Sequence, residues 1–195
     1  MNKLLLLLSV LLVSTWVSAQ TGPAGLALND KAPDFTAKDQ NGQSFHLQEQ
    51  LKKGPVVLVF YRGQWCPFCN RQLKKLEDSL SFITGKGASL VAVSPEIMEN
   101  IEKTIKKTKA TYPVVHDDGM KIMKAYDVLY DVDDATIKRY QGYGLDFNKA
   151  NGEDIGNRLP VPALYVIKKD GTIAFRHFDP DYRKRPSVAE ILQHL

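Results

Sequence analysis

Hydrophobic residues in this chain form short unbroken runs that alternate with amphipathic stretches. The run Pro55–Tyr61 is apolar and rich in β-branched residues, and turn residues bound it on both sides. It therefore predicts a strand that is buried on both faces of a sheet. Directly afterwards, Leu73, Leu76 and Leu80 recur at helical spacing with charged residues between them. This spacing predicts a helix from about Cys66 to Ser81.

The alternation of strand and helix continues to the end of the chain. Apolar runs and turn signals predict a hairpin over 34–47 and strands over 89–93, 112–116, 163–167 and 172–175. Amphipathic spacing predicts helices over 95–109, 117–126 and 187–195, the last capped by Ser187. Residues 131–158 are polar and glycine-rich without a period, and we interpret them as an insertion or long loop. This order predicts an α/β fold with helices on both faces of the sheet.

The first residues have the pattern of a secretory signal. Asn2 and Lys3 precede an apolar run of ten residues, and the small residues Val17–Ala19 fit a signal peptidase site. The run is about half as long as the roughly 20 residues that span a bilayer. We expect residues 1–19 to be a cleaved signal peptide, 20–30 a linker and 31–195 one domain, exported to a bacterial periplasm and free of the membrane. Retention of the segment as a membrane anchor is the alternative.

Composition excludes several other classes of protein. The 195 residues are 44% hydrophobic and 25% charged, which is typical of one globular domain and not of a disordered chain. The 26 Lys and Arg residues against 22 Asp and Glu give a net charge of only +4, without a basic stripe between aromatic residues. We therefore predict no nucleic-acid partner.

The two cysteines, Cys66 and Cys69, stand where the buried strand turns into a helix, with Pro67 suited to the first helical turn. Unpaired N–H groups at a helix N-terminus favour thiolate over thiol and lower a cysteine pKa from about 8.5. Residues three apart lie on the same helical face, so the two sulfurs can form a disulfide within one turn. The pattern predicts a redox centre.

Other uses of a cysteine pair fit this sequence less well. A passive structural disulfide would close a very short loop and would remove little chain entropy. A zinc site needs two more ligands, and the four histidines show no metal-like spacing. Covalent haem needs a histidine after the second cysteine, where this chain has Asn70. We predict no metal and no cofactor, since the chain has no flavin or nicotinamide motif either.

Several segments together resemble the alkyl hydroperoxide reductase and thiol-specific antioxidant family, the peroxiredoxin-like proteins of the thioredoxin superfamily. The segments are Phe60–Leu73, Asn29–Phe35, Val91–Pro95, Tyr112–Gly119 and Leu159–Ile167. They cover nearly all of the chain after the signal. The resemblance implies a thioredoxin-like fold with a central mixed β-sheet and helices on both faces.

The resemblance leaves the roles of the two cysteines open. The family's peroxide-attacking cysteine falls on Cys69, while Cys66 replaces the family's threonine and Arg62 replaces its proline. Compared with thioredoxins instead, Cys66 becomes the exposed nucleophile and Cys69 the buried resolving thiol. In that comparison Pro162 resembles the cis-proline that faces the disulfide.

Further residues are expected to shape the site. Pro162 stands where typical peroxiredoxins have an arginine that holds thiolate and peroxide, so Arg62 or Arg158 is a candidate substitute. Trp65 and Phe68 are expected to form an apolar rim for a docking partner, with core packing as the alternative for Phe68. Thioredoxins also bury an aspartate in the strand before the motif. The run 56–61 contains no acid, so the base that would help the resolving thiol is not identified.

Three hypotheses remain for the function, two enzymatic and one not. The first is a thiol-dependent peroxidase that reduces hydroperoxides through a Cys66/Cys69 dithiol–disulfide cycle, with a thioredoxin-like protein or a small thiol as reductant. The second is a thiol-disulfide oxidoreductase that acts on exported protein partners, with Cys66 as nucleophile. The third is a binding or structural protein that keeps only the scaffold. The fold and the family resemblance favour the peroxidase, whereas the Cys-Pro-Phe-Cys pair and Pro162 favour the oxidoreductase; we predict a peroxidase with a thioredoxin-style dithiol centre.

Overall fold

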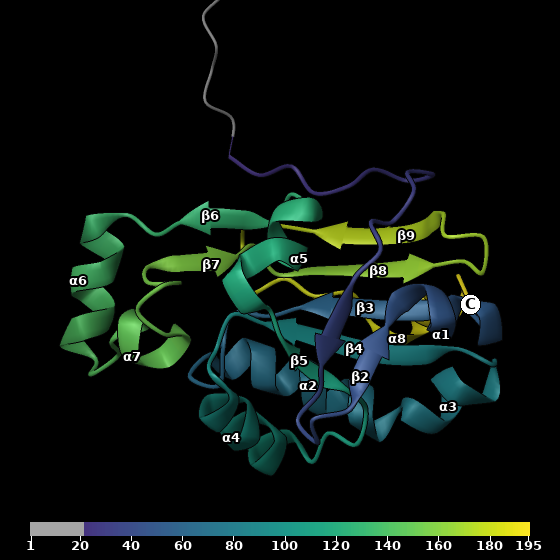
Figure 1. The fold of residues 1–195 in the computed structure, drawn as a ribbon, viewed down its shortest axis with the longest axis horizontal. Helices are drawn as coiled ribbons and strands as arrows, with labels where there is room; N and C mark the ends of the chain where they lie inside the picture. The colour runs from purple at the N-terminus through teal and green to yellow at the C-terminus, as the bar shows by residue number, and fades with distance from the viewer. Residues whose placement is uncertain (1–21) are drawn as a thin grey trace, which may run out of the picture.

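A five-stranded mixed sheet forms the centre of the protein in a computed structural model that describes residues 22–195 (Figure 1). The strand order is β5-β4-β3-β8-β9, and the strands are β3 (Val56–Phe60), β4 (Ser89–Ser94), β5 (Val114–His116), β8 (Ala163–Ile167) and β9 (Ile173–Phe178). β3, β4 and β5 run parallel, whereas β8 and β9 are antiparallel to their neighbours. The predicted signal, residues 1–19, lies outside the described residues.

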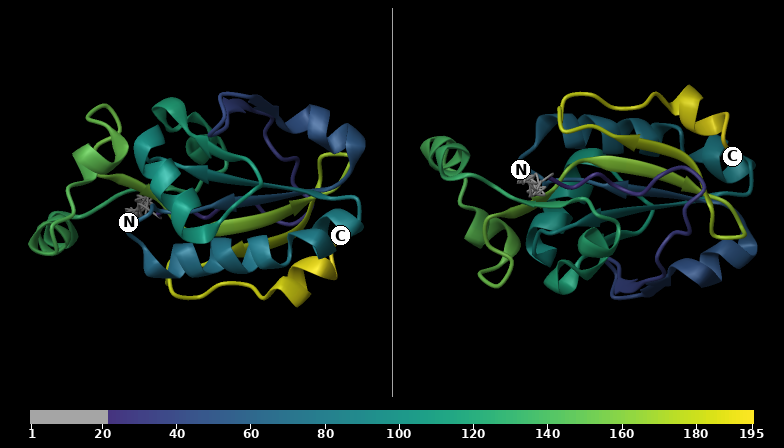
Figure 2. Two further views of the ribbon diagram at one scale, coloured as in Figure 1. Left: turned by 90° about the horizontal axis from the view of Figure 1, so that it is seen from below. Right: turned by 90° about the horizontal axis from the view of Figure 1, so that it is seen from above.

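Helices cover both faces of this sheet (Figure 2). One face carries α2 (Pro67–Asp78), α3 (Leu80–Gly85), α4 (Met98–Thr108) and α8 (Val188–Leu192). The other carries α1 (Leu47–Lys53), α5 (Lys121–Ala125), the 3-10 turn η1 (Asp118–Met120) and the hairpin of β1 (Thr36–Lys38) and β2 (Ser44–His46). Within β3, Val57 and Val59 pack into the first layer and Leu58 into the second, as alternation along a strand requires. The predicted thioredoxin-like α/β fold and doubly buried strand are confirmed.

Two predicted helices have different ends in the structure. The helix predicted over 66–81 stops at Asp78, and α3 follows after a break at Ser79, because aspartate and serine are weak helix formers. The helix predicted over 95–109 begins only at Met98. Residues 95–97, expected as the first turn, are not helical. Glu96 is buried instead, and its side chain accepts a hydrogen bond from the Gln64 backbone N–H.

Residues 131–158 differ most from the prediction. They contain two helices, α6 (Asp134–Gly142) and α7 (Phe147–Asn151), and the short strands β6 (Leu129–Asp131) and β7 (Arg158–Pro160) pair at the base of this insertion. Figure 1 shows both helices extending beyond the end of the sheet. α6 has no buried residue and therefore no hydrophobic period to find in the sequence. Its one local signal is the N-cap Asp133, whose side chain accepts from the Thr136 N–H.

The described part of the predicted linker lies against the domain. Gly25 and Asn29 donate backbone hydrogen bonds to Asp127 and Ile173, and the Leu26 N–H donates to the Tyr165 hydroxyl. Gly25 has φ +66°, and a Cβ there would lie 2.6 Å from the Phe178 ring. Residues 24–32 therefore follow the edge of the sheet as part of the fold. Across residues 22–195, no helix combines the length and the apolar character needed to cross a membrane.

Candidate active site

The Cys-Pro-Phe-Cys motif begins helix α2, six residues after the end of β3. Cys66 is the N-cap residue and Pro67 occupies the first helical position, as the sequence predicts. The loop that leads to the motif passes through Gly63 at φ +153°. A Cβ at Gly63 would lie 2.5 Å from Trp65 Nε1 and 2.7 Å from Glu96 Oε1, so the close approach of these side chains requires glycine.

The two sulfurs lie 2.7 Å apart and both cysteines are free. The Cys69 thiol donates to Cys66 Sγ, and the Cys69 backbone N–H donates to the same sulfur at 3.4 Å. Both residues are fully buried. The pair is therefore arranged to form a disulfide with little movement of the backbone.

Arg62 lies directly over Cys66. Its Nη2 donates to Cys66 Sγ at 3.1 Å and its Nη1 to the Tyr140 hydroxyl at 3.2 Å. Its guanidinium lies 3.7 Å from the centre of the Tyr182 ring and is only 4% exposed. A buried cation held in contact with a sulfur stabilises the thiolate. Of the two candidate arginines, Arg62 is the one that reaches the motif.

These contacts shift the pKa values of the two cysteines in opposite directions. The hydrogen bond from Cys69, together with the charge and hydrogen bond of Arg62, lowers the pKa of Cys66 to about 5 against the opposing effect of burial. Burial raises the pKa of Cys69 well above its ordinary value, and its hydrogen bond to Cys66 raises it further. Cys66 is thus a thiolate at neutral pH, and Cys69 is a thiol that can supply a proton.

A C-terminal strap, residues 179–187, closes the site from the other side. Arg185 Nη2 donates to Cys69 Sγ at 3.7 Å, and Tyr182 packs edge-on against Phe68 with ring centres 5.7 Å apart. Sequence reasoning did not find Arg185 or Tyr182. The only signal was the basic run Arg183–Arg185, and nothing local connects it to a motif over one hundred residues earlier.

Trp65 and Phe68 contribute to an aromatic bowl on the Cys66 side of the motif. Trp65 packs against Tyr140 of α6 and Phe147 of α7, with ring centres 5.1 and 5.6 Å apart. The bowl has a volume of about 310 Å³ and is lined by Arg62, Trp65, Pro67, Phe68, Arg139, Tyr140, Tyr143 and Tyr182. The insertion thus supplies one wall of the site. Because both Trp65 and Phe68 are half-buried, they pack within the domain and line the bowl at once.

Glu96 is a buried acid beside the motif loop that the sequence analysis did not single out. It follows β4, is fully buried, and accepts a hydrogen bond from the Gln64 N–H at 2.7 Å through Oε2. Its Oε1 has no partner among the described residues, and the same holds for Trp65 Nε1. Burial raises the pKa of Glu96 to about 8, with a smaller contribution from the Cys66 charge. A protonated carboxyl beside the motif loop is the candidate proton reservoir of the site.

Pro162 and Arg158 do not take the places proposed from the sequence. The described residues include no cis peptide bond, so Val161–Pro162 is trans, contrary to the resemblance to a cis-proline. The chain runs extended from β7 into β8 here, with the Val161 N–H bonded to the Val128 carbonyl. Pro162 is buried next to Ala163, the residue paired with Phe60, and so lies at the same end of the sheet as the motif loop. Arg158 donates instead to the carbonyls of its own loop, at Ile155 and Asp154.

Residues 28–176 match the AhpC/TSA family, and this range includes the motif, Arg62 and Glu96. This chain belongs to that family. The predicted membership in a peroxiredoxin-like family is confirmed. As an AhpC/TSA protein it departs from the family pattern by the extra Cys66 and by Arg62, the two groups that make contact in the structure.

The relatives of this AhpC/TSA protein include peroxidases and disulfide oxidoreductases by name. Peroxiredoxin Q, chloroplastic, from Gentiana triflora is 33% identical over 60% of this chain and 52% of its own length. Thiol-disulfide oxidoreductase ResA from Geobacillus thermodenitrificans is 31% identical over 64% of this chain and 71% of its own length. The matched region thus spans about half of the peroxiredoxin Q relatives.

Solved structures support the same fold. Peroxidoxin BcpB from Mycobacterium tuberculosis has a TM-score of 0.65 at 20% identity over 86% of this chain and 94% of that one. The thioredoxin domain of a thiol-disulfide oxidoreductase from Bacteroides vulgatus has a TM-score of 0.55 at 19% identity over 81% and 93%. At this identity the likeness concerns the fold alone. Among residues 22–195, no group of three or more His, Cys, Asp and Glu side chains is placed to hold a metal ion.

Proposed function

We propose that this protein is a thiol-dependent peroxidase in which Cys66 attacks the hydroperoxide and Cys69 resolves the product. The observation that carries the proposal is the hydrogen bond from the buried Arg62 to Cys66 Sγ. An arginine in this position holds the thiolate and can donate to the peroxide oxygen, where negative charge develops as the O–O bond breaks. The roles are the reverse of those that the family position of Cys69 implies.

The proposed cycle has two steps. The Cys66 thiolate attacks the near oxygen of the hydroperoxide, the O–O bond breaks, and the alkoxide leaves with a proton as alcohol or water, which gives a Cys66 sulfenic acid. Cys69 then attacks the sulfenic sulfur, loses its thiol proton, and displaces hydroxide, which leaves as water. The product is a Cys66–Cys69 disulfide, which an external thiol donor must reduce.

Glu96 is proposed to take part in proton handling on the Cys66 side. Its carboxyl is protonated below about pH 8 and has a free oxygen that faces the loop next to Trp65. As a neutral acid it leaves the Cys66 thiolate without a second negative charge nearby. If Glu96 ionised, its negative charge would disfavour the negative charge of the Cys66 thiolate.

A second candidate function is disulfide exchange with exported proteins, with Cys66 as nucleophile. The similarity to ResA and the N-cap position of Cys66 favour it, and export itself rests on the signal proposed for residues 1–19. Both functions use the same dithiol. They differ in which oxidant reacts fastest with it, a hydroperoxide or the disulfide of a protein partner.

The deciding experiment mixes the reduced protein with hydrogen peroxide in stopped flow and follows the fluorescence of Trp65, which lies next to Cys66. A second-order rate constant that exceeds that of a free low-pKa thiolate by about a hundredfold or more would support the peroxidase, since acidity alone does not confer such a rate. A rate constant equal to that of a free thiolate would sink it. Mixed disulfides trapped by a Cys69→Ser variant would then favour the second function.

A further inference from the structure

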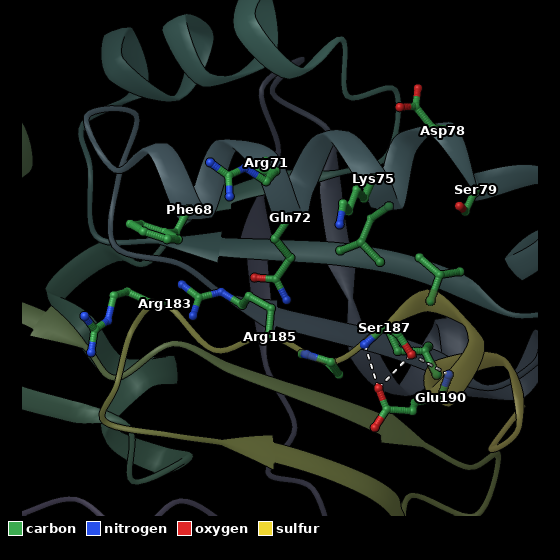
Figure 3. A pocket seen from close by; sticks show the side chains of 14 residues that line it. Phe68, Arg71, Gln72, Lys75, Asp78, Ser79, Arg183, Arg185, Ser187 and Glu190 are labelled. Carbon is green, nitrogen blue, oxygen red and sulfur yellow. Dashed lines mark hydrogen bonds between the residues drawn. The ribbon is translucent and has the colours of Figure 1, made fainter.

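A basic groove lies on the Cys69 side of the motif, between α2 and the C-terminal strap. It has a volume of about 600 Å³, within the range of sites that bind small organic molecules. Phe68, Arg71 and Lys75 line it from α2, where spacings of three, four and seven residues place them on one helical face. Arg183 and Arg185 line it from the strap, and Figure 3 shows Arg185 extending toward Phe68 and Arg71.

The charge of the groove is not neutralised by its own residues. Among residues 22–195, Arg71, Lys75 and Arg185 have no carboxylate within ion-pair distance. The two acids that line the groove are already engaged. Asp78 pairs with Lys74, and Glu190 accepts from the hydroxyl and backbone N–H of Ser187 in a capping box. The groove therefore has three unpaired cations for an anionic ligand.

Phe68 separates this groove from the aromatic bowl, and among residues 22–195 it is the only one that lines both. The bowl lies on the side of Arg62, which contacts Cys66. The groove lies on the side of Arg185, which contacts Cys69 and has a buried Nε without a partner in the described part of the chain. Neither cysteine lines the groove itself, so a ligand held there would reach Cys69 past Arg185.

We propose that the basic groove binds the carboxylates of a small thiol that reduces the Cys66–Cys69 disulfide. The inference deepens the proposed function, because it names the class of reductant that would complete the cycle. Arg71 and Lys75 would pair with the carboxylates, which are the groups that a peptide-like thiol such as glutathione carries. Arg185 covers Cys69 in this structure, and a carboxylate in the groove gives its guanidinium an alternative partner.

The proposed reduction consumes two thiols. The first, as thiolate, attacks Cys69 Sγ, the disulfide breaks, and the electron pair leaves on Cys66, the better leaving group because its thiol is the more acidic. The second thiolate attacks the ligand sulfur of the mixed disulfide and releases Cys69. The thiols leave as their own disulfide. One of their two protons goes to Cys69 and the other to solvent, since Cys66 remains a thiolate.

The test measures how fast the disulfide form is reduced by glutathione and by the uncharged thiol 2-mercaptoethanol, each per unit of thiolate. The protein is oxidised with diamide, so the measurement does not need peroxidase activity. The groove variant is Arg71→Gln/Lys75→Gln, two exposed positions. The matched control is Lys168→Gln/Lys169→Gln, which removes the same charge from the exposed turn between β8 and β9, at the other end of the sheet.

We expect the ratio of the glutathione rate constant to the 2-mercaptoethanol rate constant to fall about five- to tenfold in the groove variant, as loss of two partly exposed ion pairs predicts. The control should keep the ratio within about twofold. An equal fall in both variants, or no fall in the groove variant, would overturn the proposal. So would a diamide-treated protein without a Cys66–Cys69 disulfide, which would sink the peroxidase cycle as well.

A second arm separates a reductant site from a peroxide site. The reduced protein is oxidised by a carboxylate-bearing fatty-acid hydroperoxide and by the uncharged cumene hydroperoxide. We expect the same ratio of oxidation rates in the groove variant and the control. If the groove variant lowers this ratio and leaves the thiol ratio intact, the groove serves an anionic peroxide and the reductant proposal is wrong. A third outcome is slow oxidation by every peroxide together with the expected fall of the glutathione to 2-mercaptoethanol ratio in the groove variant. This outcome would reject the peroxidase and leave the thiol site standing.

Discussion

Cys66 and Cys69 are the same residue type, three positions apart, yet their surroundings differ in almost every respect. Cys66 caps the helix and accepts hydrogen bonds from Arg62 and from the thiol and backbone N–H of Cys69. Cys69 lies one turn into α2, is as fully buried as Cys66, and has Arg185 as a more distant cation at 3.7 Å. The first is held as a thiolate with a pKa of about 5, whereas the pKa of the second is raised.

This difference shows that helix position, the hydrogen bonds from Cys69 and one arginine favour the thiolate at Cys66 over Cys69. Cys66 at the N-cap accepts from a free N–H of the first turn, whereas Cys69 at the third helical position donates to Cys66. Arg62 increases the contrast, because its hydrogen bond goes to the sulfur of Cys66 and not to that of Cys69. The following substitutions test which contacts create this difference between the two cysteines.

Exchange of each cysteine for serine has the largest expected effect. Cys66→Ser removes the thiolate and should slow peroxide consumption by about a thousandfold or more. Cys69→Ser should keep a fast first oxidation, since the serine hydroxyl can still donate to Cys66 Sγ, and should accumulate a sulfenic acid. Stopped-flow fluorescence and trapping with dimedone measure the two outcomes. The reverse pattern would make Cys69 the peroxide-attacking residue and would end the assignment made here.

Glu96→Gln should change the pH dependence of stability. The folded state raises the pKa of Glu96 to about 8 from an ordinary 4.5, so the unfolded chain loses this proton first as the pH rises. The contribution of Glu96 is therefore fully present below about pH 4.5, declines above it, and is lost once the pH passes about 8. At pH 9 the glutamine variant should exceed the wild type in unfolding free energy by roughly 3 to 5 kcal/mol, at about 1.4 kcal/mol per pKa unit.

Urea unfolding of the reduced protein at pH 5 and pH 9 measures this effect. The matched control is Glu99→Gln, because Glu99 lies three residues further along the chain and its side chain is 71% exposed. The control should follow the wild type at both pH values. Parallel curves for wild type and Glu96→Gln would show that Glu96 is ionised in the folded state, and its place as a proton reservoir would be lost.

Arg62→Gln should reduce the contrast between the two cysteines. Loss of the cation and of its hydrogen bond raises the pKa of Cys66, so less thiolate is present at pH 7 and the peroxide rate falls about 10- to 100-fold. Titration of thiolate absorbance near 240 nm measures the pKa directly. Arg158→Gln serves as the control, since Arg158 binds only the carbonyls of its own loop. An unchanged titration in Arg62→Gln would assign the acidity to the hydrogen bonds from Cys69 and to the helix terminus.

Tyr140→Phe is the smallest and most specific change. It deletes the hydroxyl that accepts from Arg62 Nη1 and keeps the ring that packs on Trp65. We expect a two- to fivefold slower peroxide reaction, about the effect of one hydrogen bond to a charged group. Tyr143→Phe is the matched control, because Tyr143 is 79% exposed at the edge of the bowl. Equal rates in both variants would mean that α6 does not position Arg62.

The sequence predicted the strands and the motif well because their signals are local. An unbroken apolar run such as Val56–Phe60 has no stable place except the inside of a sheet, and its packing into both core layers agrees. The helix that follows was predicted within a few residues from its leucine spacing. Helices α6 and α7 were not, because α6 is exposed and has no apolar face to reveal it, and α7 has only five residues, too few to show a helical period.

The residues of the candidate site also divide into those with a local signal in the sequence and those without one. Cys66, Pro67 and Cys69 form a contiguous motif, and Arg62 is only four residues away, so the sequence could suggest all of them. Arg185 is 116 residues from Cys69, and Tyr140 is 78 residues from Arg62. A single sequence gives no sign that such residues meet. The prediction that Arg158 or a cis Pro162 completes the site failed for the same reason.

By itself, then, the sequence determined that a thiol pair stands at a strand-to-helix junction of an α/β fold, because hydrophobic periodicity and helix capping act over a few residues. Only the tertiary structure decided which sulfur is the thiolate. That choice depends on burial and on contacts made in the folded chain, in which Cys69 and Arg62 donate to Cys66 and Tyr140 of the insertion accepts from Arg62. An electrostatic environment is the sum of everything packed around a group, and chain folding creates it.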